Sequence, residues 1–157
     1  INKILHTPVT SLRAPQQRSE RQNALNVVER LFDLVQDVEN YPSFLPWCDS
    51  AEIKEKHEDF IIAEIRCQLQ GVPIKFSTKN KNNRPEKIEI SLVEGPFKDL
   101  GGMWNFTDLG DNNSRIELDL HWKMKSFLLE KTLGLVFEKI AQKIFESFVR
   151  KAYERKR

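Results

Sequence analysis

Three segments in which apolar residues recur at every second position place the strongest constraint on the fold of this 157-residue chain. The longest covers residues 116–124, where apolar side chains alternate with Glu, Asp, His and Lys. The other two cover residues 61–69 and 88–92. Successive side chains of a strand point to opposite faces, so this period predicts strands with one apolar and one polar face. An antiparallel sheet that is covered on one side only requires this pattern.

The C-terminal part of the chain predicts the element that covers the apolar face of this sheet. Residues 127–156 repeat apolar side chains at helical spacing, with charged residues on the opposite side. A helix of this length extends over about 45 Å and needs a sheet of similar length to lie on. We therefore expect an α+β fold in which about six antiparallel strands curve around a long C-terminal helix.

The first third of the chain contains a shorter helix. An opening strand could lie at residues 1–5 or at 21–25, and Asn26 is a suitable N-cap for a helix that ends near residue 40, because Pro42 disfavours helical geometry before it. Residues 41–47 predict a turn or a broken helix that directs Phe44, Leu45 and Trp47 inward. We assign residues 1–20 to an N-terminal extension, for which flexibility is one interpretation, and 21–157 to the folded domain.

Composition excludes several classes of protein. A net charge of +2 does not by itself favour nucleic acid, and the chain has no apolar run near the roughly 18 residues that span a bilayer. Cys48 and Cys67 match no zinc spacing, which favours free buried thiols in a cytoplasmic protein. The three histidines are scattered, so we expect no metal site. We also expect no catalytic residues, because the nearest carboxylate pair, Glu117 and Asp119, lies on a polar strand face.

Three motifs in order resemble one known family. They are FDLVQDVENYPSFLPWC at residues 32–48, VEGPFK at 93–98 with GMWNF at 102–106, and FEK at 137–139 followed by Phe148. Together they resemble the RatA and coenzyme Q-binding family of the START-like superfamily, over residues 23–153. The resemblance implies a helix-grip fold with a cavity between the sheet and the C-terminal helix.

The resemblance also implies two roles without catalysis and without a required cofactor. The first is binding of a hydrophobic isoprenoid of the ubiquinone type, which supports respiration. The alternative is a RatA-type toxin that binds the large ribosomal subunit and blocks subunit association. A cyclase-like enzyme on the same fold is the third interpretation and the least favoured.

Candidate cavity residues are apolar, mostly aromatic, and come from separate segments. Their pattern alone is typical of an ordinary core, but the resemblance to a cavity-bearing fold implies contact with a ligand. The set comprises Phe44, Trp47, Phe97, Trp104, Trp122, Val136, Phe137 and Ile140. Polar groups of Trp104, Trp122, Tyr41 and Thr78 are candidates to orient a quinone carbonyl.

A basic cluster gives the alternative role its candidate surface. It comprises Lys75, Lys79, Lys81 and Arg84, and the three lysines share one face of a predicted strand. Such a stripe suits contact with the phosphates of ribosomal RNA, and nothing in it favours reading of bases or binding of DNA. The simpler interpretation is a solvated face. We expect at most peripheral contact with a membrane.

Overall fold

The computed structural model describes residues 3–13, 29–84, 86–110 and 113–154. These residues form seven strands, a helical segment at 29–36, a short 3-10 helix and a long C-terminal helix. In chain order the elements are β1 (Lys3–Arg13), η1 (Val38–Ser43), β2 (Cys48–Lys56), β3 (Phe60–Leu69), β4 (Val72–Asn83), β5 (Lys87–Glu94), β6 (Phe97–Gly110), β7 (Asn113–Met124) and α2 (Phe127–Tyr153).

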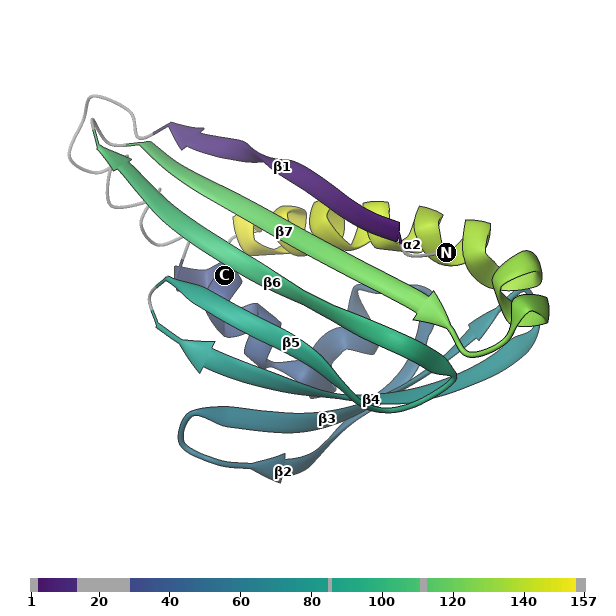
Figure 1. Cartoon of the computed structure of the whole chain (residues 1–157). Helices are drawn as coiled ribbons and strands as arrows, with labels where there is room; N and C mark the ends of the chain where they lie inside the picture. Colours follow the sequence, from purple (N-terminus) through teal and green to yellow (C-terminus); the bar gives the residue numbers. More distant parts are fainter. Residues whose placement is uncertain (1–2, 14–28, 85, 111–112, 155–157) are drawn as a thin grey trace.

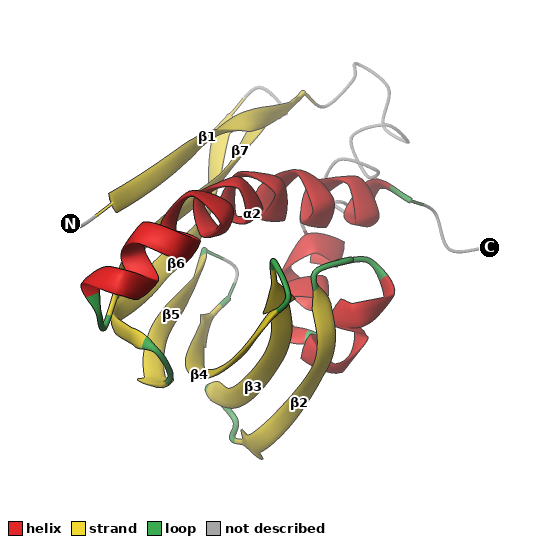
Figure 2. Cartoon of the chain, turned by 90° about the vertical axis from the view of Figure 1, so that its right-hand side faces the viewer, coloured by secondary structure: helices red, strands yellow, loops and turns green. Residues whose placement is uncertain are grey.

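The strands form one antiparallel sheet in the order β1-β7-β6-β5-β4-β3-β2. Strands β2 to β7 each pair with their neighbour in the chain, as short hairpin connections require. The sheet curves, and α2 crosses its concave face (Figures 1 and 2). The predicted fold, a curved sheet wrapped around a long C-terminal helix, is confirmed.

The edge strand β1 was only partly anticipated. It pairs with β7 from Lys3 opposite Trp122 to Arg13 opposite Asn113, so the sheet has seven strands and not about six. It overlaps the predicted opening strand at 1–5, whereas the alternative at 21–25 lies outside the described residues. Residues 3–13 thus belong to the sheet, although we had placed them in an N-terminal extension. A period of two is weak here, which is why the pattern did not separate this strand from a tail.

The first helical region ends differently from the prediction. The α-helical segment stops at residue 36, and η1 then carries the chain through Pro42 to Ser43. The Tyr41 hydroxyl donates to the carbonyl of Val35, and the backbone N–H of Leu45 donates to the carbonyl of Tyr41 at 2.9 Å. The first bond satisfies a carbonyl that the end of a helix leaves without a partner. Leu45 is buried, and Phe44 and Trp47 pack against the core from half-buried positions.

The long helix begins where the chain offers a capping residue. Ser126 is the N-cap, and its hydroxyl accepts a hydrogen bond from the backbone N–H of Leu129 at 3.0 Å. The 27 residues of α2 extend over about 40 Å. Its buried apolar residues recur mostly every three or four positions, which confirms the predicted apolar face; they are Leu133, Phe137, Ala141, Phe145, Phe148, Val149 and Ala152.

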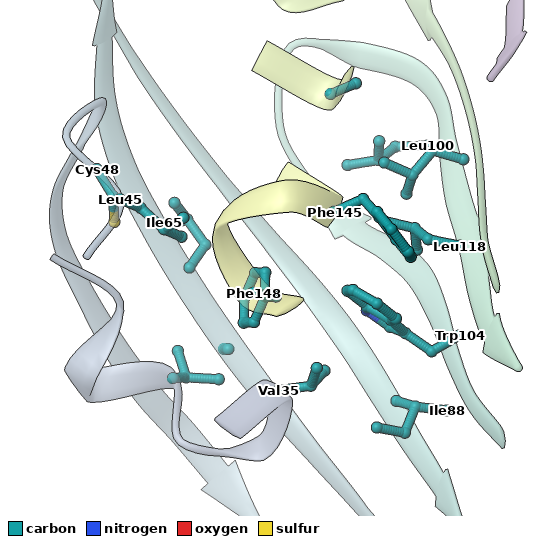
Figure 3. Close-up of a cluster of buried hydrophobic side chains, with 14 of the residues drawn as sticks. Val35, Leu45, Cys48, Ile65, Ile88, Leu100, Trp104, Leu118, Phe145 and Phe148 are labelled. Atoms are coloured by element: carbon teal, nitrogen blue, oxygen red, sulfur yellow. The ribbon is translucent and has the colours of Figure 1, made fainter. Parts of the chain in front are cut away.

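Aromatic side chains join α2 to the sheet. The ring of Trp104, on β6, lies 6.0 Å from that of Phe145 and 5.6 Å from that of Phe148 (centroid distances). In Figure 3 these three side chains face one another between the helix and the strands, with Leu118 beside them. Each large side chain buried in this way contributes about 1.5–3 kcal/mol of transfer free energy. Of the helices that the structure describes, none is long and apolar enough to cross a membrane.

Candidate ligand cavity and outer sheet surface

A cavity of about 110 Å³ lies between α2 and the concave face of the sheet. Its walls come from most of the elements after β1, because every second side chain along each strand points toward the helix. The lining residues are Val35, Val38, Tyr41, Leu45, Trp47, Ala63, Ile65, Phe76, Thr78, Asn80, Ile90, Leu100, Trp104, Leu118, Leu120, Phe137, Ile144 and Phe148.

Two polar side chains sit on this apolar wall. Thr78 and Asn80 occupy the inward face of β4, with exposed fractions of 6% and 5%. The Thr78 hydroxyl donates to Oδ1 of Asn80 at 3.0 Å. This bond uses the Thr78 proton and the Asn80 carbonyl, while the Asn80 amide still carries N–H donors and the hydroxyl oxygen can still accept. The pair can therefore form a hydrogen bond with a polar atom of an otherwise apolar ligand.

The structure brings only part of the predicted cavity set to this wall. Trp47, Trp104 and Phe137 line the cavity. The other predicted residues pack around it without lining it; they are Phe44, Phe97, Trp122, Val136 and Ile140. The Phe97 ring contacts those of Phe76 and Phe137, at centroid distances of 5.5 and 5.3 Å. These residues form the layer behind the wall, so whether they touch a ligand stays a prediction.

The four candidate orienting groups differ in whether their polar atoms line the cavity and remain available to a ligand. Thr78, Trp104 and Tyr41 line the cavity, but the Tyr41 hydroxyl proton is already donated to Val35. Burial, together with Asp37 and Cys48, raises the pKa of Tyr41 far above its ordinary value, so this phenol stays neutral. The indole Nε1 of Trp122 is buried without a hydrogen-bond partner in the described part of the chain, and its ring packs against Phe137 at 5.0 Å.

Sequence reasoning missed Asn80 as a wall residue. The signal was present, because assigning Lys75, Lys79 and Lys81 to the outer face of a strand places Asn80 on the inner face. An Asn in a strand usually indicates an exposed position or a turn, and this preference hid the pattern.

Both cysteines are free and buried, as predicted. They face each other across the β2–β3 pair, in register. Burial, with a smaller contribution from Asp49, raises the pKa of Cys48 to about 11. Burial also raises the pKa of Cys67 to about 12, with smaller contributions from Cys48 and Asp49. Neither thiol is a nucleophile near neutral pH, because the thiolate is the reactive form.

The outer face of the sheet carries an open hollow of about 530 Å³ over β4 to β7. Lys79 and Lys81 line it together with Glu89, Asp119 and His121, so its charge is mixed. The Nζ atom of Lys79 lies 4.3 Å above the centroid of the Phe60 ring. Lys75 is exposed further along the same face of β4. We refer to Lys75, Lys79 and Lys81 as the β4 lysine stripe.

Arg84, the fourth residue of the predicted basic cluster, points elsewhere. It forms an ion pair with Asp33, and its guanidinium lies 4.3 Å from the centroid of the Phe32 ring. Both partners belong to the helical segment 29–36, so Arg84 ties this segment to the turn after β4. Among the described residues, no group of three or more His, Cys, Asp or Glu side chains could hold a metal ion.

The chain belongs to the polyketide cyclase/dehydrase and lipid transport family, whose model matches residues 27–149. This confirms the START-like resemblance drawn from the three motifs. The family description covers both catalysis and lipid transport, so membership alone does not separate an enzyme from a binding protein.

Individual relatives have more specific names than the family as a whole. The ribosome association toxin RatA of Pseudomonas aeruginosa is 37% identical over 78% of this chain and 85% of its own length. The RatA protein of Escherichia coli is 35% identical over 80% of both chains. Among solved structures, the Zhui aromatase/cyclase of a Streptomyces species superimposes with a TM-score of 0.75, covering 97% of this chain and 94% of its own. That structure shares 13% identity and supports the fold alone.

Proposed function

We propose that this chain associates with the ribosome and binds the large subunit, so that the two subunits cannot join. The observation that carries the proposal is the identity of 35–37%, over about four fifths of the chain, with proteins named ribosome association toxins. This was the alternative interpretation of the sequence, and the relatives favour it over the quinone interpretation. A ribosomal partner would also agree with the predicted cytoplasmic location.

The β4 lysine stripe is the surface we assign to ribosomal RNA. Its lysines project from one face of the strand: Lys79 and Lys81 are about 6–7 Å apart along β4, which is close to the spacing of successive phosphates, and Lys75 lies about 13 Å before Lys79, with Ser77 between them. Glu89, directly opposite Lys81 on the neighbouring strand β5, and Asp119 also line the hollow, and their carboxylates would repel phosphates there. We therefore expect the RNA backbone to run along β4 and not across the hollow.

Charge reversal tests this assignment. The triple variant Lys75→Glu, Lys79→Glu, Lys81→Glu should no longer sediment with purified large subunits through a sucrose cushion. The matched control is Lys131→Glu, Lys139→Glu, Lys143→Glu, which makes the same charge change on the exposed side of α2. If phosphates are the contact, wild-type affinity should fall steeply with salt, because each neutralised phosphate adds to the slope of log affinity against log salt.

The outcomes separate two failures. If the wild-type protein does not sediment with large subunits even at low salt, the ribosomal function is wrong. If both triple variants sediment as well as wild type, the function holds but this face is the wrong one. A gradient of mixed subunits, with and without the protein, then tests whether association of the subunits is blocked.

A second candidate function is non-catalytic binding of an apolar ligand in the cavity, with ubiquinone as the example from the sequence. It is favoured by the Thr78–Asn80 pair on an apolar wall and by the family's description as lipid transport proteins. The volume of 110 Å³ is below the roughly 300–1,000 Å³ of sites for larger organic ligands. A quinone ring with its isoprenoid tail would therefore have to displace side chains of α2.

Mass spectrometry of organic extracts from purified protein tests this second function directly. A titration with a short-chain quinone should quench the fluorescence of Trp104 saturably, and a Trp104→Phe variant should lose that part of the signal. The Zhui fold supports catalysis in another protein, so absence of catalysis here stays a prediction. If extracts contain no lipid and no quinone quenches saturably, the cavity is only a packing gap.

A further inference from the structure

The hollow on the outer face of the sheet lies where two rows of side chains cross neighbouring strands. Strands β4, β5, β6 and β7 run side by side there (Figure 1), and their register gives the order within each row. From β4 to β7 the first row is Lys79, Ser91, Gly101 and His121, and the second row is Lys81, Glu89, Met103 and Asp119. The two residues at the centre of the first row have almost no side chain. The sheet is therefore hollow between a lysine on one side and an imidazole on the other.

Gly101 allows the imidazole of His121 to lie across β6. A Cβ atom on this glycine would be 2.8 Å from both Cε1 and Nε2 of the ring, so the outer edge of the imidazole lies directly over Gly101. The Nε2 atom is 3.3 Å from Oδ2 of Asp99, which holds the ring in this position. Histidine is one of the side chains on which unstacked bases of RNA stack. The β7 side of the hollow thus offers a positioned ring.

The charges around the hollow are divided between its two sides. Lysines line it on β4, whereas Glu89 and Asp119 line it on β5 and β7. The Glu89 side chain is 40% exposed, and its only printed neighbour of opposite charge, Lys87, is 3.5 Å away in an exposed pair that is weak in water. Carboxylates repel phosphates but accept hydrogen bonds from the N–H groups of bases. A matching ligand therefore has its negative charge near β4 and its N–H donors farther across the sheet.

A nucleotide has this distribution of groups. Neighbouring strands are about 4.8 Å apart, so β6 lies about 10 Å from β4 and β7 about 14 Å. A phosphate on the lysines of β4 would place the sugar over β5 and the base over β6, beside the His121 ring. The volume of about 530 Å³ is within the roughly 300–1,000 Å³ of sites for organic ligands.

We infer that the hollow binds one unstacked nucleotide of ribosomal RNA, whose base carries an amino group and lies between Glu89 and His121. This inference rests on the proposed ribosomal function and adds one base contact to the backbone contacts of the β4 lysine stripe. The carboxylates that keep the backbone out of the hollow are the groups that accept from the base. The nucleotide belongs to a loop or a bulge, because bases within an RNA helix cannot be reached in this way.

Filling the hollow is the first test. Ser91→Phe places a ring in the hollow without a change of charge, and it should weaken sedimentation with large subunits about tenfold or more, as loss of a stacked base does. Thr107→Phe is the matched control, because Thr107 is also exposed on the outer face but lies at the other end of β6. Its effect should stay within about twofold. Thermal melts should show that both variants fold as wild type does, since both positions are exposed.

The sign of a charge effect is the second test. Glu89→Gln should weaken subunit binding by about fivefold or more, because a carboxylate that accepts from the base is lost. Glu94→Gln makes the same charge change at an exposed position that pairs with Ser77, next to the β4 lysine stripe but outside the hollow. It should leave binding unchanged or strengthen it, because one carboxylate that repels phosphates is removed. Chemical probing with dimethyl sulfate and kethoxal should show one unpaired base that wild type protects and Ser91→Phe does not.

The outcomes separate this inference from the function on which it rests. If wild type does not sediment with large subunits at low salt, both fail. If wild type sediments and Ser91→Phe does so equally well, the ribosomal function stands and the base contact is wrong. The base contact is also wrong if Glu89→Gln strengthens binding as Glu94→Gln does, since the hollow then faces phosphates only. If Ser91→Phe abolishes binding of guanosine monophosphate but leaves subunit binding intact, the hollow belongs to a free nucleotide and the inference is overturned.

Discussion

The two faces of strand β4 carry side chains of opposite character. The inner face presents Phe76, Thr78 and Asn80 to the cavity, while the outer face presents the β4 lysine stripe. Neighbouring residues thus serve different environments, because side chains alternate along a strand. The comparison teaches that the two surfaces proposed here, one for an apolar ligand and one for ribosomal RNA, share one strand and can still be altered independently by substitution.

The inner face is also unlike an ordinary core. A buried amide that lacks hydrogen bonds costs about 1–3 kcal/mol, so a wall that served stability alone would carry Val or Leu in place of Thr78 and Asn80. The outer face is exposed to water, and its lysines contribute little to the free energy of unfolding. Substitutions on the inner face should therefore change the free energy of unfolding more than substitutions on the outer face.

The largest effect is expected at Trp104. This side chain is 2% exposed and contacts Phe145 and Phe148 of α2, so Trp104→Ala should destabilise the protein by about 3–5 kcal/mol in urea unfolding. Trp104→Phe, which keeps an aromatic ring, is the control and should lose less than half of that. A loss below about 1 kcal/mol for the Ala variant would show that the inner face is not a packed wall.

The Thr78–Asn80 pair should give an intermediate effect that depends on which partner is removed. Asn80→Ala leaves the buried Thr78 hydroxyl without its acceptor and should cost about 1–3 kcal/mol. The double variant Thr78→Val, Asn80→Leu removes both polar groups and should be close to neutral in stability. A double-mutant cycle by urea unfolding, with the single variants Thr78→Val and Asn80→Leu and their combination, measures the coupling. Strict additivity would mean that the two side chains do not interact on the inner face.

How far the sequence predicts these features follows from the range of the interactions involved. The period of two in β3 and β7 and the helical period of α2 are local, so strands, helix and outer lysines could be predicted. Asn80 could be placed by the same alternation, although its residue type argued against it. The cavity itself could not be predicted from the sequence, because its volume depends on how closely α2 approaches the sheet. Arg84 shows the same limit, since its contact with Phe32 and Asp33 joins residues about fifty positions apart.

The buried thiols provide a pH-dependent test of the inner side of the sheet. The pKa of Cys67 is about 12 in the folded protein, against an ordinary value of 9.0, so folding favours the protonated thiol. Its contribution to stability is complete below pH 9 and is lost as pH rises toward 12. Stability of wild type should therefore fall over this range more steeply than that of Cys67→Ala, as measured by urea unfolding at each pH. Equal slopes would show that this thiol is not shielded from water.

The smallest effects are expected on the outer face, and they decide how charge-reversal results are interpreted. Lys75→Ala and Lys81→Ala should change the free energy of unfolding by less than about 0.5 kcal/mol, because both side chains are exposed. Lys79→Ala should cost slightly more, about 0.5–1 kcal/mol, because its ammonium lies over the Phe60 ring. Lys79→Met keeps the aliphatic stem and removes the charge, which separates packing from the cation–π contact. If any of these variants lost as much stability as Asn80→Ala, the outer face would be part of the structural core. Loss of ribosome binding in the triple Glu variant could then result from unfolding, whereas the small values expected here make it a direct measure of the lysines' contact.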